Sequence, residues 1–358
     1  MTAEGTSFEH LSRRVQIARL RKLAGVALEA YDLGALRLTL LAHLFNTTFR
    51  VDTDTGQRYV LRIHRAGTPT VESVNAELAW LHALRRDTTL EVPDPVPTRT
   101  GTLLTVAAIT SVPTPHICVL FRWLNGRQVD AGLKPTHLER TGALMARLQD
   151  HAAQFGPPPG FARGRVDYPV EMARNLPDPF SLAVINYCRT LVADTLSEQE
   201  AEQVTAVIEW VHLAEQALGI SEGERPPTFG LIHADLHQYN LIFSRGTVRA
   251  IDFDDCGFGP LLYDLAVPLT MLQGRAEYPA LRAALLRGYR RVRPLSDEHE
   301  AYLDTFIALR HLQDALWVLE YRKHPVIRDD WDAPAQARRS LARVTAFLAA
   351  GGRFPDPT

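Results

Sequence analysis

The chain has 358 residues and a mass of 40.0 kDa, more than one hydrophobic core usually serves, so we expect two lobes with a cleft between them. Hydrophobic residues make up 46% of the chain and charged residues 22%, which excludes a disordered or fibrous protein. The formal net charge of -2 excludes binding of nucleic acid by overall charge alone, so we expect no nucleic-acid partner.

The cysteines are few and widely spaced, at Cys118, Cys188 and Cys256, and match neither a disulfide framework nor a zinc-binding pattern. We interpret them as reduced thiols in the core. The N-terminal residues contain no apolar segment of the signal-peptide type, and no stretch approaches the roughly 20 uncharged residues that cross a bilayer. We therefore expect a cytoplasmic protein without a membrane partner.

The first third of the chain predicts a small sheet. Apolar positions recur at helical spacing from residue 8 to about residue 31, and we assign residues 1–33 to a helical lead-in. The pattern that follows predicts an antiparallel meander of three strands, at residues 36–45, 48–54 and 58–65. A helix and then two more strands are predicted at residues 70–86, 102–106 and 116–123.

The pattern breaks at Asn125-Gly126, which is the predicted hinge between residues 1–125 and residues 126–358. The second part is mostly helical, with helices expected at residues 137–154, 180–195, 198–218, 261 onward, 278–292, 298–323 and 334–349. The exception is residues 228–253, which predict a strand, a polar loop and a hairpin with its turn at Arg245-Gly246. The expected class is therefore α+β.

The polar loop "HADLHQYN", residues 233–240, carries the chemistry. Asp235 and Asn240 lie on this loop, and Asp252 of "IDFDD" follows the hairpin, so we expect the three side chains to converge at the mouth of the cleft. Asn240 and Asp252 offer the hard oxygen ligands that Mg²⁺ prefers. Asp235 is placed to accept a hydroxyl proton. Together they provide what phosphoryl transfer requires, although either loop residue alone would be interpreted as a turn residue.

The motifs "HADLHQYN", "IDFDD" and "YDLA" resemble those of the aminoglycoside phosphotransferase and choline kinase group, which includes bacterial homoserine kinases and has a bilobal protein-kinase-like fold. The resemblance covers the region from about residue 26 to residue 321. It implies that Asp235 is the catalytic base, that Asn240 and Asp252 hold Mg²⁺, that Asp264 braces the catalytic loop and that His233 is structural. It also implies ATP as the phosphate donor.

The resemblance extends to the N-terminal lobe, which would bind the nucleotide, while the C-terminal lobe would bind the acceptor. In "RYVLRI", Arg62 takes the place of the cation that pairs with nucleotide phosphates and with a glutamate on the next helix, here Glu77. The phosphate loop contains no glycine, so Asn46 and Thr47 would supply polar contacts instead. The adenine would meet the backbone of two residues of "FRWLNG", Arg122 and Leu124.

Several further residues have two interpretations. His237 faces the transferring phosphate or packs against the loop. Of Asp254 and Asp255, one reaches a second metal ion or a substrate amine, or both cap the next element, and for Asp255 we expect capping. A long C-terminal helix should line the acceptor pocket. Its candidate residues could bind the substrate, and packing of the helix explains them equally well; they are Arg310, His311, Trp317, Glu320 and Tyr321.

Three functions follow from these motifs. The first is a kinase for the hydroxyl of a small metabolite such as homoserine, choline or a sugar. The second is a serine/threonine protein kinase of the bacterial stress-response type, and the third is a nucleotide-binding pseudokinase scaffold. Residues 265–358 contain fourteen Lys and Arg against eleven Asp and Glu, which disfavours a polycationic antibiotic as acceptor. The sequence indicates no oligomeric state.

Overall fold

The computed structural model describes residues 8–34, 36–174, 176, 178–221, 226–322 and 331–354. The start of the predicted lead-in, at residues 1–7, lies outside the described residues, as do residues 355–358. The chain forms two compact units, one made of the residues up to 125 with residues 157–162, and the other of residues 126–156 and those from 163 onward. Within the described ranges, no helix combines the length and the apolar character needed to cross a bilayer.

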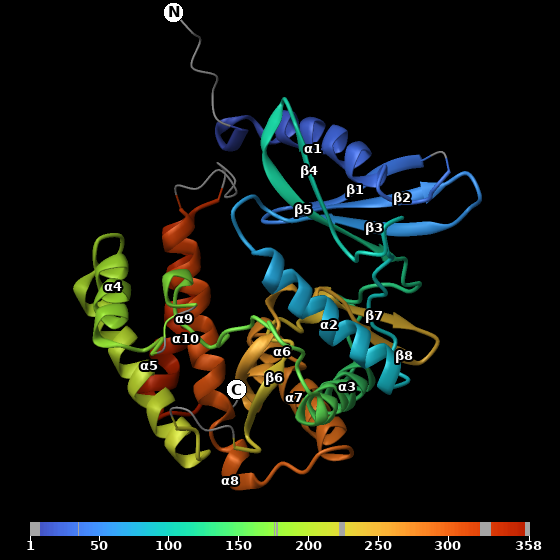
Figure 1. Ribbon diagram of the computed structural model, residues 1–358. Helices are drawn as coiled ribbons and strands as arrows, with labels where there is room; N and C mark the ends of the chain where they lie inside the picture. Colours follow the sequence, from blue (N-terminus) through green and yellow to red (C-terminus); the bar gives the residue numbers. More distant parts are fainter. Residues whose placement is uncertain are drawn as a thin grey trace, which may run out of the picture. The chain divides into compact units, whose positions relative to one another are not determined.

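The first unit is built around a five-stranded antiparallel sheet in the order β1-β2-β3-β5-β4 (Figure 1). Its elements are η1 (Phe8–His10), α1 (Arg13–Leu28), β1 (Leu36–His43), β2 (Thr47–Thr53), β3 (Arg58–Ile63), α2 (Val71–Asp87), β4 (Thr105–Ile109) and β5 (Val112–Arg122). The core of this sheet is formed by buried apolar residues of α1 and of the strands, among them Leu23, Phe49 and Leu120. The predicted meander and the predicted helix between the third and fourth strands are confirmed.

The second unit is mainly helical. Its helices are α3 (Pro135–Gln154), η2 (Glu171–Ala173), α4 (Leu182–Ala193), α5 (Glu198–Ala217), η3 (Gln238–Asn240), η4 (Phe253–Asp255), α6 (Leu261–Leu272), α7 (Tyr278–Arg290), α8 (Asp297–Glu300), α9 (Leu303–Tyr321) and α10 (Ala333–Ala349). Two glycines allow α3 and α7 to pack with their backbones in close contact. A Cβ at Gly142 would lie 2.0 Å from the Leu285 carbonyl oxygen, and one at Gly288 would lie 1.8 Å from that of Glu139.

Two short two-stranded ladders carry the polar loop. β6 (Phe229–Ile232) pairs with β9 (Gly257–Pro260), and β7 (Leu241–Ser244) pairs with β8 (Thr247–Ala250). The hairpin β7–β8 turns at Arg245 and Gly246, both with positive φ, as a two-residue turn requires. Strand β9 was not predicted, because the sequence Gly-Phe-Gly-Pro has none of the β-branched residues that mark a strand.

One predicted helix is wrong in part. The helix expected at residues 298–323 is divided into α8 and α9 around Ala301, and its last position, residue 323, lies outside the described residues. Ser296 caps the short helix α8 by accepting a hydrogen bond from the His299 N–H. No proline or glycine marks the break, and the apolar period continues across it. The sequence therefore predicted a single helix. The predicted α+β class is nevertheless confirmed by the antiparallel sheet and the mainly helical second unit.

Candidate active site

The loop after β6 is held by one buried carboxylate. Asp264, in the first turn of α6, is fully buried and accepts hydrogen bonds from the backbone N–H of Ala234 at 2.8 Å and of His233 at 3.4 Å. Ala234 has a φ of 68°, a left-handed conformation that side chains disfavour. Burial raises the pKa of Asp264 to about 6, although the bonds from Ala234 and Gln149 act in the opposite direction. Asp264 therefore fixes a strained turn just before Asp235.

His233 joins the same loop to the segment that follows the hairpin. Its Nε2 lies 3.1 Å from the Ile251 carbonyl oxygen, its Nδ1 accepts from the Asp235 N–H at 3.4 Å, and its ring lies 4.5 Å from the ring of Phe253. Burial lowers the pKa of His233 to about 4, so the ring is neutral near pH 7. A neutral ring that donates through Nε2 and accepts through Nδ1 satisfies both contacts.

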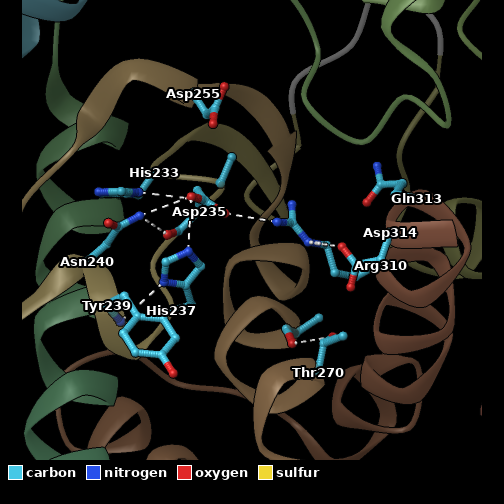
Figure 2. Close-up of polar contacts among 12 residues, drawn as sticks. His233, Asp235, His237, Tyr239, Asn240, Asp255, Thr270, Arg310, Gln313 and Asp314 are labelled. Atoms are coloured by element: carbon cyan, nitrogen blue, oxygen red, sulfur yellow. Dashed lines mark hydrogen bonds and ion pairs between the residues drawn. The ribbon is translucent and has the colours of Figure 1, made fainter. Parts of the chain in front are cut away.

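The Asp235 carboxylate is fixed from two sides, as Figure 2 shows. The Asn240 Nδ2 donates to Asp235 Oδ2 at 3.0 Å and to the Asp235 backbone oxygen at 2.8 Å. The Arg310 Nη2 donates to Oδ1 at 2.9 Å. The His237 Nε2 lies 3.4 Å from Oδ2, while its Nδ1 accepts from the Tyr239 N–H. The carboxylate is thus oriented while its side chain remains one-fifth exposed.

Arg310, from α9, is itself held by several partners. Its Nη1 donates to the Tyr263 hydroxyl at 3.1 Å, and its Nε lies 3.5 Å from Asp314 Oδ1. Although burial opposes the charge, Tyr263, Asp314 and Asp235 raise the pKa of Arg310 well above its usual value. The sequence placed Arg310 on the acceptor side only. The structure brings it into direct contact with Asp235, 75 positions away in the chain.

The residues of "IDFDD" are arranged around a backbone kink. Asp252 has a φ of 63° and an exposed side chain, and the preceding Ile251 N–H donates to the Asn240 carbonyl oxygen at 2.9 Å. The Asp254 carbonyl oxygen accepts from Arg163 at 2.6 Å. The expectation that Asp255 caps the next element is wrong. β9 follows it, and its carboxylate accepts from Arg174 at 3.1 Å.

The residues predicted to meet the nucleotide lie in the first unit. The Arg62 Nη2 on β3 lies 2.5 Å from Glu77 Oε2 on α2, and the guanidinium lies over the Phe121 ring at 5.1 Å. Both partners of this ion pair are buried. The pairing of cation and glutamate that the sequence predicted is therefore present.

The predicted phosphate loop and hinge residues have their own partners. Thr47, at the start of β2, is buried, and its hydroxyl lies 2.7 Å from His43 Nδ1. The carbonyl oxygen of the adjacent Asn46 accepts from the Leu44 N–H at 3.1 Å. The Arg122 N–H donates to the Asp94 carbonyl oxygen at 2.9 Å, so that donor already has a partner within the protein. Leu124 is half-buried two residues beyond β5.

The other predicted residues of α9 contact neighbouring side chains. The ring of Trp317 lies 5.6 Å from the ring of Tyr321 and 5.8 Å from that of Trp331. The His311 Nε2 lies 2.6 Å from Gln273 Oε1, and His311 is buried. None of the described contacts joins these residues to Asp235, unlike Arg310, Tyr263 and Asp314. Tyr263 and Asp314 were not predicted as part of the site, because their role depends on the contact of Arg310 with Asp235.

The model of the phosphotransferase enzyme family matches residues 38–302. The chain belongs to this family. The predicted resemblance is therefore confirmed, and the chain is a phosphotransferase of this family, with the protein-kinase-like fold that its structural relatives share.

Two curated relatives are similar over most of their length. An uncharacterized protein of Deinococcus radiodurans is 31% identical over 303 residues, which cover 83% of this chain and 80% of that protein. A homoserine kinase of Polaromonas naphthalenivorans is 28% identical over 267 residues, which cover 72% of this chain and 73% of that protein.

Two solved structures are similar over almost the whole chain. A microcompartment-associated aminopropanol kinase is 27% identical, with a TM-score of 0.75, and the match covers 93% of this chain and 98% of that one. An amicoumacin kinase, solved with AMP-PNP and Ca²⁺, is 20% identical, with a TM-score of 0.69 over 93% of this chain and 96% of that one. Related structures of this fold thus hold a nucleotide and a divalent cation.

Proposed function

We propose that the chain is a kinase that transfers the γ-phosphate of ATP to a hydroxyl group of a small metabolite. The observation that carries the proposal is the Asp235 carboxylate, which Asn240 and Arg310 hold in place on a loop that Asp264 braces. A fixed and partly exposed carboxylate is what in-line attack by a hydroxyl requires. The first unit would bind the nucleotide, and the second would carry the reaction and bind the acceptor.

Asp235 would accept the hydrogen bond of the acceptor hydroxyl. The hydroxyl oxygen then forms a bond to the γ-phosphorus while the bond between that phosphorus and the β–γ bridging oxygen breaks. ADP leaves, and the hydroxyl proton passes to Asp235. Because this transition state is loose, most of the contribution of Asp235 is orientation of the nucleophile, with proton removal late in the step.

Asn240 and Asp252 fit the requirements of a magnesium site. The Asn240 Nδ2 donates twice to Asp235, which leaves the amide oxygen as the atom that would bind a cation. Asp252 is exposed and directly follows Ile251, whose N–H is bonded to the Asn240 backbone. Both would supply hard oxygen ligands. Bound Mg²⁺ would neutralise charge on the β- and γ-phosphate oxygens.

Arg62 would contact the phosphates of the nucleotide and would be oriented by Glu77. Asn46 and Thr47 would add polar contacts in place of the glycines that this loop lacks, and the backbone of Arg122 and Leu124 would meet the adenine. Since the Arg122 N–H already donates to Asp94, we assign the Arg122 contact to its carbonyl oxygen. His233 and Asp264 would keep the catalytic loop in its strained conformation.

For the acceptor we propose a small amino alcohol. The relatives named as homoserine kinase and aminopropanol kinase share an acceptor that carries both a hydroxyl and an amino group. Carboxylates that could attract an ammonium group stand close to the Asp235 contacts, since Asp314 pairs with Arg310 and Asp255 belongs to the loop after Asp252. His237, Asp254, Trp317 and Tyr321 would complete the acceptor side.

The test is ATP turnover by the full chain with a panel of hydroxyl compounds, with and without Mg²⁺. The panel contains homoserine, aminopropanol, choline, a sugar and casein, and the product is detected as radiolabelled phosphate on the acceptor. We expect Mg²⁺-dependent transfer to an amino alcohol. Transfer to casein alone would instead show a protein kinase, and nucleotide binding without any turnover would show a scaffold, and either result would overturn the proposal.

A further inference from the structure

Arg310 makes a contact that the proposed chemistry does not by itself require. The catalytic base of a phosphotransferase needs one free lone pair toward the acceptor, yet Asp235 accepts a hydrogen bond on each oxygen. Asn240 binds Oδ2 at 3.0 Å from the same loop, and Arg310 binds Oδ1 at 2.9 Å from α9 (Figure 2). The two donors approach from different elements, so they restrict rotation of the carboxylate about its χ2 angle.

We propose that Arg310 is a positioning residue for Asp235, one that fixes the direction in which the carboxylate meets the acceptor hydroxyl. The inference rests on the proposed function, since it takes Asp235 as the group that receives the hydroxyl. Asn240 alone leaves the carboxylate free to turn about the Oδ2 contact. A second anchor on Oδ1 removes that freedom, and the unshared lone pairs of the carboxylate then point in one direction only.

Arg310 is suited to this task because it is held at several points. Its guanidinium bonds to Tyr263 at 3.1 Å and lies 3.5 Å from Asp314. The Tyr263 hydroxyl donates to Gln313 at 2.7 Å, and Gln313 donates to the Tyr168 carbonyl oxygen at 2.7 Å. These bonds therefore fix the position of Asp235 Oδ1 relative to α6, α9 and the segment before η2. A planar guanidinium can bind three partners at fixed angles, which an ammonium group cannot do.

The location of Arg310 excludes the simplest structural explanation, in which it only joins two helices. A guanidinium that served only to pack α9 would have sufficient partners in Tyr263 and Asp314. Arg282 is an arginine of that kind, because it pairs with Asp304 of α9 at 2.5 Å. Its side chain is 23% exposed, against 25% for Arg310. Among the described residues, the ion-pair partners of Arg282 are Asp304 and Glu300, and neither lies on the catalytic loop. Arg282 is therefore a matched control.

The experiment compares the variants Arg310→Gln, Arg310→Lys and Arg282→Gln of the full chain at saturating Mg-ATP. A misplaced catalytic group costs about 10²-fold in rate, so we expect kcat of Arg310→Gln to fall by about that factor while the KM for ATP changes less than about threefold. Arg310→Lys keeps the positive charge but lacks the planar guanidinium with its paired donors. Its kcat should be about tenfold higher than that of Arg310→Gln. Arg282→Gln should lower the melting temperature while its kcat stays within about twofold of wild type.

A second measurement separates positioning from folding. In Arg310→Ala, guanidinium ions at concentrations of tens of millimolar should restore about tenfold in kcat, and the same ions should do nothing for Arg282→Ala. Retention of wild-type kcat by Arg310→Gln would overturn the inference. Equal loss of kcat in the Arg310 and Arg282 variants without rescue would overturn it too. Lack of turnover in the wild type itself would overturn the proposed function, and the inference with it.

Discussion

Two arginine–carboxylate pairs, one in each unit, have the same chemistry and different surroundings. Arg62 and Glu77 are sealed, with only 6% and 1% of their side chains exposed. Arg310 and Asp235 are open, at 25% and 20%. The Arg62–Glu77 pair fixes the relation between β3 and α2, so that Glu77 orients the guanidinium that would contact the nucleotide phosphates. An open pair leaves part of the carboxylate accessible to a substrate, and this is the difference between a supporting pair and a reacting one.

The largest effect on stability should come from the sealed pair. Glu77→Gln removes the buried carboxylate that Arg62 contacts, and breaking a buried ion pair costs about 3–5 kcal/mol. We expect the free energy of unfolding to fall by about that amount in urea titrations, and the affinity for ATP to fall with it. The double variant Arg62→Met/Glu77→Leu should be more stable than Glu77→Gln, because no buried charge remains. A stability of Glu77→Gln within about 1 kcal/mol of wild type would show that the pair is not sealed in solution.

The next largest effect on stability should come from Asp264, which holds the loop that carries Asp235. Asp264→Ala leaves two buried backbone N–H groups, of Ala234 and His233, without their acceptor, and we expect a loss of about 3 kcal/mol. Asp264→Asn keeps one acceptor oxygen and should lose about half as much. Urea unfolding measures both. Equal stabilities of the two variants would mean that the carboxylate does not hold the loop.

A smaller effect should follow from removing the exposed carboxylate assigned to the metal. Asp252→Ala should weaken binding of Mg-ADP by about tenfold, or about 1.4 kcal/mol, in titration calorimetry, with no change in unfolding. Asp297→Ala is the control, since Asp297 lies in α8 with a fully exposed side chain. Magnesium titrations of Asp252→Ala that match those of wild type would move the metal site elsewhere.

The last effect is on the dependence of stability on pH. Burial lowers the pKa of His233 to about 4 and that of His311 to about 3, so both stay neutral when the unfolded chain binds protons below about pH 6.5. Each should therefore lower the free energy of unfolding by about 1.4 kcal/mol per pH unit as the pH falls from 6.5 toward 4. Asp264, whose pKa is raised to about 6, opposes this trend by favouring the folded state as the pH falls from 6 to 4.

The variant His311→Gln isolates one of these contributions. Glutamine retains the hydrogen bond to Gln273 and does not titrate, so the pH dependence between pH 6.5 and 5 should become shallower by about 1.4 kcal/mol per unit. Unfolding in urea at the two pH values measures it. An unchanged slope would show that His311 is not held neutral by burial.

The sequence predicted the parts of this site that are close together in the chain. Asp235 and Asn240 are five positions apart on one loop, and the hairpin that follows brings Ile251 and Asp252 back to it, so local pattern and turn chemistry suffice. The pairing of Arg62 with Glu77 was also predicted, from the resemblance of "RYVLRI" to the third strand of the kinase fold.

What the sequence could not predict depends on packing at long range. Arg310 reaches Asp235 only because α9 lies against α6, and no periodicity specifies that register. The same holds for Asp255, whose partner Arg174 is 81 positions earlier. Strand β9 was missed because its Gly-rich sequence gains its conformation from pairing with β6. In each case the deciding interaction joins segments that local propensity treats separately.

We propose that the carboxylate of Asp235, one-fifth exposed, receives the acceptor hydroxyl. Asp235→Asn preserves the size and the contact with Asn240 but cannot accept a proton. The decisive measurement is single-turnover phosphate transfer by this variant to the amino alcohol that wild type uses, together with calorimetric binding of Mg-ADP. We predict a transfer rate lower by about 10³-fold with nucleotide affinity unchanged within about twofold. Wild-type transfer, or equal losses of transfer and nucleotide affinity, would show that Asp235 does not receive the acceptor hydroxyl.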